Sequence, residues 1–190
     1  ERLRLYRPVD EVVELSWDAT NTAIPWWLSG AAVNSALALG HVDALWSRMQ
    51  ADFGQSVLGV RDARFMQARY AEHPSRSHEW VLVRNRFTRK AEGLAVCKLE
   101  ADGRLEILDL LGAAEKFPAV VGAVLSHAAR TGRKGVFMWL TQSHQHLLAK
   151  AQPTVAVIHV RVPTNCWVPG NTDVEVDRRW WLTGGDTDFR

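Results

Sequence analysis

Residues 105–140 read LEILDLLGAAEKFPAVVGAVLSHAARTGRKGVFMWL, and this stretch decides the fold. Its first part, residues 105–111, is mainly apolar and predicts a buried strand. Residues 117–131 carry apolar side chains at the spacing of one helix face, and Gly132 ends that helix. Residues 136–140 are apolar again and predict a second strand. A strand, a helix and a strand within about thirty residues indicate a parallel crossover unit.

The segments before this unit predict two helices and an antiparallel meander. Apolar residues recur at helical spacing over residues 42–49, and a second helix is expected over residues 62–72, where a His-Pro step stops it. Residues 80–83 and 92–99 read as strands on either side of a basic hairpin connection. Together with the first strand of the crossover unit they form a three-stranded antiparallel meander.

The ends of the chain add further elements. After the crossover unit, we expect a short helix over residues 143–151, a strand over residues 154–162 and a last strand over residues 178–183. Near the start, residues 3–15 read as strand-like, and residues 31–39 read as a short helix. The sequence therefore predicts an α+β fold: a mixed, mostly antiparallel central sheet with flanking helices and one parallel crossover.

The regularity of the pattern suggests two parts of the chain. We expect residues 1–40 to form an N-terminal arm or the remnant of a preceding segment, and residues 41–190 to form one domain. The arm is rich in tryptophan between Trp17 and Trp27, and neighbouring indole rings suit a contact surface. The arm is therefore a candidate for self-association, and a homodimer is one expectation.

Composition excludes several classes of protein. The chain has 190 residues, and 23 Lys and Arg against 21 Asp and Glu leave a formal net charge of +2. A hydrophobic content of 47% excludes a fully disordered chain, and no apolar stretch approaches the ~20 residues of a membrane-spanning helix. The absence of an extended basic face argues against nucleic-acid binding. Two isolated cysteines, Cys97 and Cys166, suit a reducing compartment, so we expect a cytoplasmic protein.

The order of elements resembles the GNAT superfamily of acyl-CoA-dependent N-acyltransferases over residues 41–190. Four local features are similar to the C-terminal part of larger bacterial GNAT-like proteins: Arg69-Tyr70 with His73-Pro74, the strand around Gly93, Leu108-Asp109-Leu110, and WLTGGDTD at residues 181–188. Some of those proteins are linked to polysaccharide or amino-sugar biosynthesis. The resemblance implies a GNAT-like fold and an enzyme that moves an acetyl or other acyl group to an amine, such as an amino sugar. The alternative is a degenerate, noncatalytic GNAT-like domain that binds a substrate or a protein partner.

The resemblance implies a cofactor, acetyl-CoA or another acyl-CoA, in a wedge between the two strands of the crossover unit. Its pyrophosphate would lie on backbone N–H groups where the helix begins. The matching residues are Leu111, Gly112, Ala113, Ala114 and Lys116. This loop lacks the family pattern of Arg or Gln, two residues, Gly, one residue, then Gly or Ala. Glu115 adds a negative charge near the expected phosphate, and Pro118 removes a donor, so the loop favours the noncatalytic alternative.

Acylation of an amine needs a base and an acid. Glu106 and Asp109 are the carboxylates near the wedge, and on an ideal strand they lie on opposite faces unless a bulge intervenes. Burial would raise the pKa of the Asp109 carboxyl toward that of a useful base, whereas a structural Asp109 would bond backbone at the strand end. The family's usual acid is a tyrosine in the helix after the second crossover strand, where this chain offers Ser143 or His144.

The last residues suggest a substrate site. Trp181, Asp186 and Asp188 are candidates for acceptor binding, because an aromatic ring beside carboxylates suits a sugar and its hydroxyl groups. The alternative is a plain chain terminus. No spacing of His and Cys residues matches zinc ligands, so we expect no metal. Cys97 lies among apolar residues and reads as a buried, inert thiol.

Overall fold

The structure is a computed structural model that describes residues 8–20, 22–163 and 173–186. Its main sheet has seven strands in the order β2-β4-β5-β6-β7-β1-β8. In chain order these strands are β1 Pro8–Asp18, β2 Leu28–Val33, β4 Glu79–Asn85, β5 Ala91–Leu99, β6 Leu105–Gly112, β7 Gly135–Thr141 and β8 Thr154–Pro163. A small second sheet pairs β3 Val57–Leu58 with β9 Trp180–Trp181. Among the described strands of the main sheet, only β6 and β7 pair in parallel, which confirms the predicted fold class.

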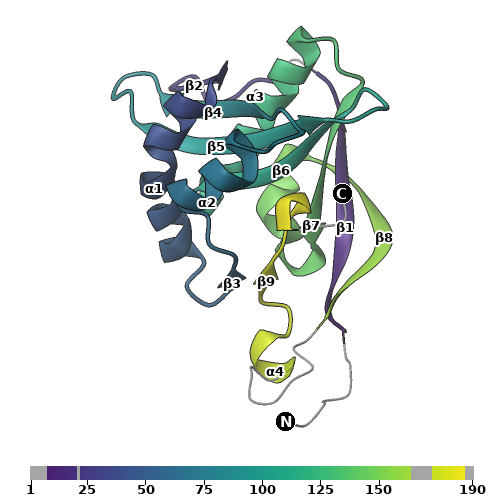
Figure 1. Cartoon of the computed structure of the whole chain (residues 1–190). Coiled ribbons are helices and arrows are strands. Elements are labelled where there is room, and N and C mark those ends of the chain that lie inside the picture. Colours follow the sequence, from purple (N-terminus) through teal and green to yellow (C-terminus); the bar gives the residue numbers. More distant parts are fainter. Residues whose placement is uncertain (1–7, 21, 164–172, 187–190) are drawn as a thin grey trace.

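Helices flank both faces of the main sheet. They are α1 Ser35–Asp52, α2 Ala63–Met66 with the π turn η1 Gln67–Ala71, the 3-10 turn η2 Ala114–Lys116, α3 Phe117–Arg130, the 3-10 helix η3 Gln142–Ala151, α4 Asp173–Val176 and the 3-10 turn η4 Gly184–Asp186. Helices α1 and α2 lie over one face and α3 lies over the other (Figure 1). Within the described residues, none of these helices is long and apolar enough to cross a membrane.

The crossover from β6 through α3 to β7 forms as the sequence predicts. The helix buries Phe117, Val120 and Val124 completely against the sheet, which is the reason for their helical spacing. It ends at Arg130, and Gly132 follows with a φ of +67°, a left-handed conformation that glycine adopts without strain. The packing of α3 on the sheet therefore fixes where β6 ends and where β7 begins.

Two strands of the main sheet, β1 and β2, come from the part of the chain where the sequence predicts an N-terminal arm. Strand β1 lies between β7 and β8 and pairs with both in antiparallel register, with Val13 opposite Leu140 on one side and Val157 on the other. Strand β2 forms the opposite edge of the sheet beside β4. Residues 8–18 and 28–33 therefore supply two strands of the main sheet. Local sequence predicted a strand but could not identify its partners, because they lie far along the chain.

Two expected helices also differ from the structure. The helix expected over residues 31–39 is instead the end of β2 followed by α1, which begins after Asn34, whose side-chain oxygen accepts the N–H of Leu37 at 2.8 Å. Pairing of β2 with β4 outweighs the helix propensity of the alanines there. The helix expected over residues 62–72 is α2 with Asp62 as its N-cap, continued by the π turn.

Candidate functional site

Strands β6 and β7 separate after a short stretch of parallel pairing. Leu105, Glu106 and Ile107 of β6 pair with Val136, Phe137 and Met138 of β7. Beyond these pairs, β6 continues beside β5, and β7 continues beside β1. The gap that opens between the two strands is the position at which the resemblance implies an acyl-CoA.

A bulge at Leu108 brings the two candidate carboxylates of β6 to one face of the sheet. The register of β6 against β5 shifts there, so that Glu106 pairs with Lys98 and Asp109 pairs with Val96. Because Lys98 and Val96 are two residues apart on β5, Glu106 and Asp109 lie on the same face. Their side chains are 0% and 1% exposed. The structure therefore contains the bulge without which Glu106 and Asp109 would lie on opposite faces.

The C-terminal segment, residues 180–186, lies across the gap between β6 and β7 (Figure 1). Its first two residues form β9 beside β3. Strand β9 is shorter than the strand that the sequence predicts over residues 178–183. Thr183 then forms an isolated bridge with Leu140 of β7. The N–H of Thr141 donates to the carbonyl oxygen of Leu182 at 3.2 Å. The segment thus pairs with the edge that β7 exposes to the gap.

The same segment reaches β6 on the other side of the gap. A Cβ atom built on Gly185 would lie 2.9 Å from the carbonyl oxygen of Leu108 and 2.0 Å from the hydroxyl oxygen of Tyr70, so only glycine fits there. The Arg69 guanidinium donates to the carbonyl oxygen of Gly185 at 2.9 Å. Both strands are therefore in contact with the C-terminal segment.

Aromatic side chains fill the space beneath this segment. Trp181 is 0% exposed. Its ring centroid lies 5.0 Å from that of Phe53, 5.3 Å from that of Phe117 and 5.7 Å from that of His144. Rings at these separations are in contact, so Trp181 packs among side chains from the end of α1, the start of α3 and η3.

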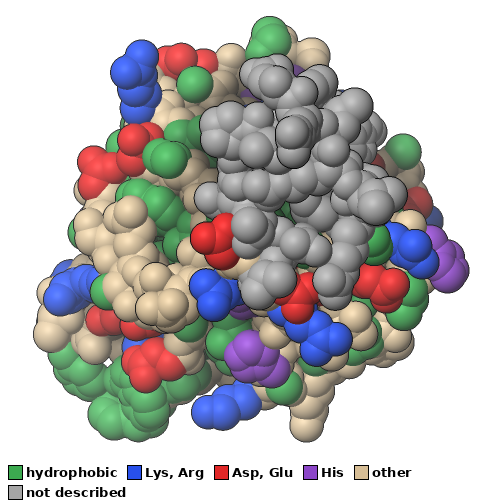
Figure 2. All heavy atoms as spheres, turned by 90° about the horizontal axis from the view of Figure 1, so that it is seen from below, with side chains coloured by type: hydrophobic (Ala, Val, Ile, Leu, Met, Phe, Trp, Pro, Cys, Tyr) green, Lys and Arg blue, Asp and Glu red, His purple; other side chains and the backbone are tan. Residues whose placement is uncertain are grey.

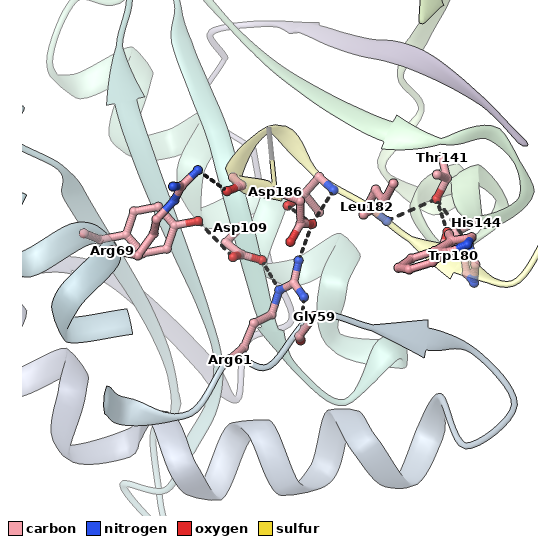
Figure 3. Close-up of polar contacts among 12 residues, drawn as sticks. Gly59, Arg61, Arg69, Asp109, Thr141, His144, Trp180, Leu182 and Asp186 are labelled. Atoms are coloured by element: carbon pink, nitrogen blue, oxygen red, sulfur yellow. Dashed lines mark hydrogen bonds and ion pairs between the residues drawn. The ribbon is translucent and has the colours of Figure 1, made fainter. Parts of the chain in front are cut away.

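A buried ion cluster fixes the far end of the segment to the domain (Figure 3). Arg61 is 0% exposed, and its Nε donates to Oδ1 of Asp109 at 2.6 Å. Its Nη2 donates to Oδ2 of Asp186 at 2.5 Å, and its Nη1 donates to the carbonyl oxygen of Gly59 at 2.8 Å. One guanidinium therefore joins β6, the C-terminal segment and the loop before α2.

Asp109 is satisfied on both of its oxygens, because the hydroxyl of Tyr70 donates to Oδ2 at 3.0 Å. Burial raises the pKa of the Asp109 carboxyl, and the positive charge of Arg61 opposes that shift. Burial likewise raises the pKa of Tyr70, and the neighbouring Asp109 adds to the effect. Asp109 is 1% exposed, so it can receive a proton from a bound substrate only if the C-terminal segment first moves away.

A second polar chain surrounds His144. The Ser143 hydroxyl donates to Oδ2 of Asp10 at 2.5 Å and lies 2.9 Å from Nδ1 of His144, while the Ser56 hydroxyl lies 3.3 Å from Nε2. The Thr141 hydroxyl lies 3.4 Å from the same Nδ1, so three hydroxyl groups surround the imidazole nitrogens. Burial lowers the pKa of His144, against the opposing charge of Asp10. The lowered pKa favours the neutral form of the imidazole.

The predicted cofactor loop is bonded within the protein. The N–H of Ala114 donates to Oδ2 of Asp52 at 2.8 Å, and the N–H of Lys116 donates to the carbonyl oxygen of Ala113 at 2.9 Å. The Lys116 ammonium pairs with Glu115 at 2.8 Å. Two carboxylates therefore lie at the helix start, where the family places a pyrophosphate, so the residues present do not fit that group.

The structure gathers some of the predicted site residues and separates others. Asp109 and Asp186 meet on Arg61, and Trp181 packs on His144. Glu106 is apart from both clusters, with its carboxylate 3.6 Å from the Lys98 ammonium. Leu111 is buried, and Gly112 has a φ of +128°. Asp188 lies outside the described residues.

Three residues that organise the site have no clear signal in the sequence. Arg61 precedes the Asp62 N-cap of a short helix and reads as one of several solvated arginines around it. Asp52 reads as the polar end of α1, and Asp10 reads as the polar position of an alternating strand. Each takes its role from a partner that is distant in sequence, so no local pattern could have identified it.

Comparisons with known proteins agree on the fold. No family model matches the chain, and no curated protein sequence matches it. A GCN5-related N-acetyltransferase from Sphaerobacter thermophilus superposes with a TM-score of 0.53 at 15% identity, over 80% of this chain and 50% of that one. A conserved protein of unknown function from Enterococcus faecalis V583, described as a probable N-acyltransferase, gives 0.59 at 11% identity, over 80% and 38%.

A functionally unknown conserved protein from Staphylococcus epidermidis gives a TM-score of 0.50 at 12% identity, over 80% of this chain and 60% of that one. This chain therefore spans 60% or less of the length of each of these three structures. At sequence identities of 11–15%, structural similarity shows a shared fold. The mixed sheet, the crossover with its separating strands and the agreement with these structures show that this chain has the fold of the GNAT superfamily.

Proposed function

We propose that this chain is a noncatalytic GNAT-fold domain that binds a substrate or a protein partner and does not hold acyl-CoA in its wedge. The observation that carries this proposal is the position of Trp181, which is 0% exposed and packs between Phe53 and Phe117 in the gap between β6 and β7. A pantetheine chain in that gap would have to displace an indole ring and the segment that carries it.

The charges at the helix start support the same proposal. Asp52 accepts the Ala114 N–H that would otherwise be available to a phosphate oxygen. Glu115 lies one residue further along the chain, and its pairing with Lys116 lowers the pKa of its carboxyl. A pyrophosphate would meet two negative charges at this end of α3, and like charges at such range repel.

An N-acyltransferase that transfers an acetyl or other acyl group to an amine, with an amino sugar as the acceptor class, is the second candidate. The fold favours it, and so does Asp109, a buried carboxylate with a raised pKa beside the gap. This function would require the C-terminal segment to leave the gap, which breaks the contacts of Asp186 with Arg61 and Thr183.

Calorimetric titration with acetyl-CoA at low salt separates the two candidates. The proteins are the wild type and Asp52→Ala, which frees the Ala114 N–H. We expect no heat from either protein at millimolar acetyl-CoA, because Trp181 still fills the gap in both. Micromolar binding by the wild type would overturn the proposal and favour acyl transfer.

A matched control is available on the same helix. Asp43 of α1 caps α2 by accepting the N–H of Ala63 at 2.8 Å, the same chemistry that Asp52 provides for η2. Asp43→Ala therefore removes an equivalent cap away from the gap. Heat from Asp52→Ala but not from Asp43→Ala would show that the loop itself can bind the cofactor, which contradicts the proposal. Release of free thiol with glucosamine as acceptor would identify the second function directly.

A further inference from the structure

Three large aromatic side chains form an exposed cluster at the β2 edge of the main sheet. Trp26, Trp27 and Phe87 are 70%, 41% and 68% exposed. The Trp26 ring lies 6.0 Å from that of Trp27 and 5.5 Å from that of Phe87. The other exposed large hydrophobic residues of the described chain are aliphatic: Leu37, Val60, Leu99, Val155 and Val157. Among the described residues, exposed aromatic rings therefore gather at this one place, here named the aromatic cluster.

Backbone hydrogen bonds hold the aromatic cluster in position. The N–H of Arg86 donates to the carbonyl oxygen of Trp27 at 2.8 Å, and its Nε donates to that of Leu28 at 2.7 Å. The side-chain oxygen of Asn85 accepts the N–H of Phe87 at 2.9 Å and closes the β4–β5 hairpin. Two segments of backbone that are hydrogen-bonded to each other therefore carry the rings. Because this backbone is already ordered, binding would lose little further conformational entropy.

The surroundings of the aromatic cluster are positively charged. The hairpin beside it carries three exposed cations, Arg86, Arg89 and Lys90, whereas Arg84 is partly buried with its Nη2 3.2 Å from Nε2 of His41. Residues 84–91 and 22–33, which form the cluster and its flanks, contain no Asp or Glu. In contrast, Lys and Arg side chains alternate with Asp and Glu side chains on the face of the molecule in Figure 2. The combination of exposed aromatic rings with two neighbouring stretches that contain cations and no acidic residue is therefore a local property.

We propose that the aromatic cluster and the three exposed cations beside it dock this domain on an anionic lipid surface. Trp and Phe rings are favoured at the boundary between lipid headgroups and acyl chains, and Lys and Arg are drawn to anionic headgroups while their stems cover apolar surface. The site requires no spanning segment. It also does not depend on whether the domain is catalytic.

The geometry argues against three other occupants. A nucleic-acid base or a sugar ring binds a flat aromatic face, whereas the Trp26 ring stands at 87° and 80° to its two neighbours and the cluster offers no shared platform. A second copy of the chain in a two-fold dimer would bring the same three cations of both copies into one interface, because such an interface pairs one patch with itself. Lipid headgroups supply the missing negative charge.

Flotation of the full chain with lipid vesicles tests this proposal. The vesicles are phosphatidylcholine alone and phosphatidylcholine mixed with phosphatidylglycerol. We expect binding to the anionic vesicles that weakens with added salt, and little binding to the neutral ones. Trp26→Ala with Phe87→Ala should reduce the affinity at least about tenfold, because the inserted rings supply the apolar contact.

Charge is tested separately with Arg89→Asn and Lys90→Gln. Arg89 has a φ of +61°, a conformation that asparagine tolerates, so this pair removes two charges without disturbing the hairpin. We expect a loss on the order of five-fold for each cation. Matched controls are Arg130→Asn with Lys134→Gln, which remove two exposed charges at and after the C-terminal end of α3, and Val155→Ala with Val157→Ala on β8. Both controls should bind like the wild type.

Several results would overturn the proposal. Equal binding to neutral and anionic vesicles would remove the charge argument. Equal losses in the cluster variants and in the controls would show that the docking surface lies elsewhere. If analytical ultracentrifugation shows that the wild type is a dimer and that Trp26→Ala is a monomer, the aromatic cluster mediates self-association instead.

Discussion

Replacing Arg61 by methionine tests whether the ion cluster holds the C-terminal segment in the gap. Arg61 is 0% exposed, and its guanidinium lies 2.6 Å from Asp109 and 2.5 Å from Asp186. Methionine keeps an unbranched stem but removes the cation, so Asp109 remains buried without a positive partner. Removal of one partner of a buried ion pair costs about 3–5 kcal/mol, and we expect the free energy of unfolding at pH 7 to fall by about that amount.

The loss of stability should shrink in acid. Burial already raises the pKa of Asp109, and removal of Arg61 raises it further above the unfolded value of about 3.9. At a pH above that value, the Asp109 carboxyl ionises readily in the unfolded chain but not in the folded variant. Ionisation therefore stabilises the unfolded state and lowers the free energy of unfolding of the variant. As the pH falls, the unfolded chain loses this advantage at up to about 1.4 kcal/mol per pH unit. The difference between variant and wild type should therefore be smaller at pH 5 than at pH 7.

Urea unfolding followed by tryptophan fluorescence at the two pH values measures both effects. The control is Arg48→Met, because Arg48 pairs with Glu92 at 3.5 Å and their side chains are 27% and 18% exposed. Such a partly exposed pair contributes about 0–1 kcal/mol. A loss for Arg61→Met no larger than that of the control, or an equal loss at both pH values, would refute the reasoning.

Three further predictions concern glycine positions and one histidine. Gly185→Ala should destabilise the protein by about 3 kcal/mol in thermal melts, because the new Cβ would lie 2.0 Å from the Tyr70 hydroxyl oxygen. Gly40→Ala is the control: its new Cβ would have no neighbour from outside the helix within 4 Å, and it should stabilise α1 by about 0.5–1 kcal/mol. Gly112→Ala should cost about 1–3 kcal/mol in the same assay, because φ is +128° there; an unchanged midpoint would contradict the strain. Burial lowers the pKa of His144, so NMR titration of its imidazole should give a midpoint below about 6.5. The stability that the neutral imidazole contributes should fall as the pH drops through the unfolded pKa of about 6.5. A midpoint at or above about 6.5 would contradict burial of a neutral imidazole.

Much of the fold could be predicted from the sequence. The crossover over residues 105–140 is marked by apolar runs and a helical period, and both follow from which side chains face the core. The meander before it is marked by short strands and turn residues. The resemblance to the GNAT superfamily depended on this order of elements, and the solved structures confirm it as a likeness of fold.

The candidate site was only partly predictable. Asp109 stood out as a carboxylate in an apolar run, and the loop around Gly112 stood out because its pattern departs from that of the family. The bulge at Leu108, by contrast, is a feature of pairing with β5, and it alone places Glu106 and Asp109 on one face. The roles of Ser143 and His144 as acid remain predictions.

The sequence by itself determined the succession of helices and strands and the burial of their apolar faces, because these depend on neighbours a few residues away. Only the tertiary structure decided that β1 lies between β7 and β8, that Arg61 is buried between Asp109 and Asp186, and that Trp181 fills the gap between β6 and β7. These contacts join residues that are far apart along the chain. Whether a charged side chain is solvated or buried depends on whether such a distant partner compensates its loss of water.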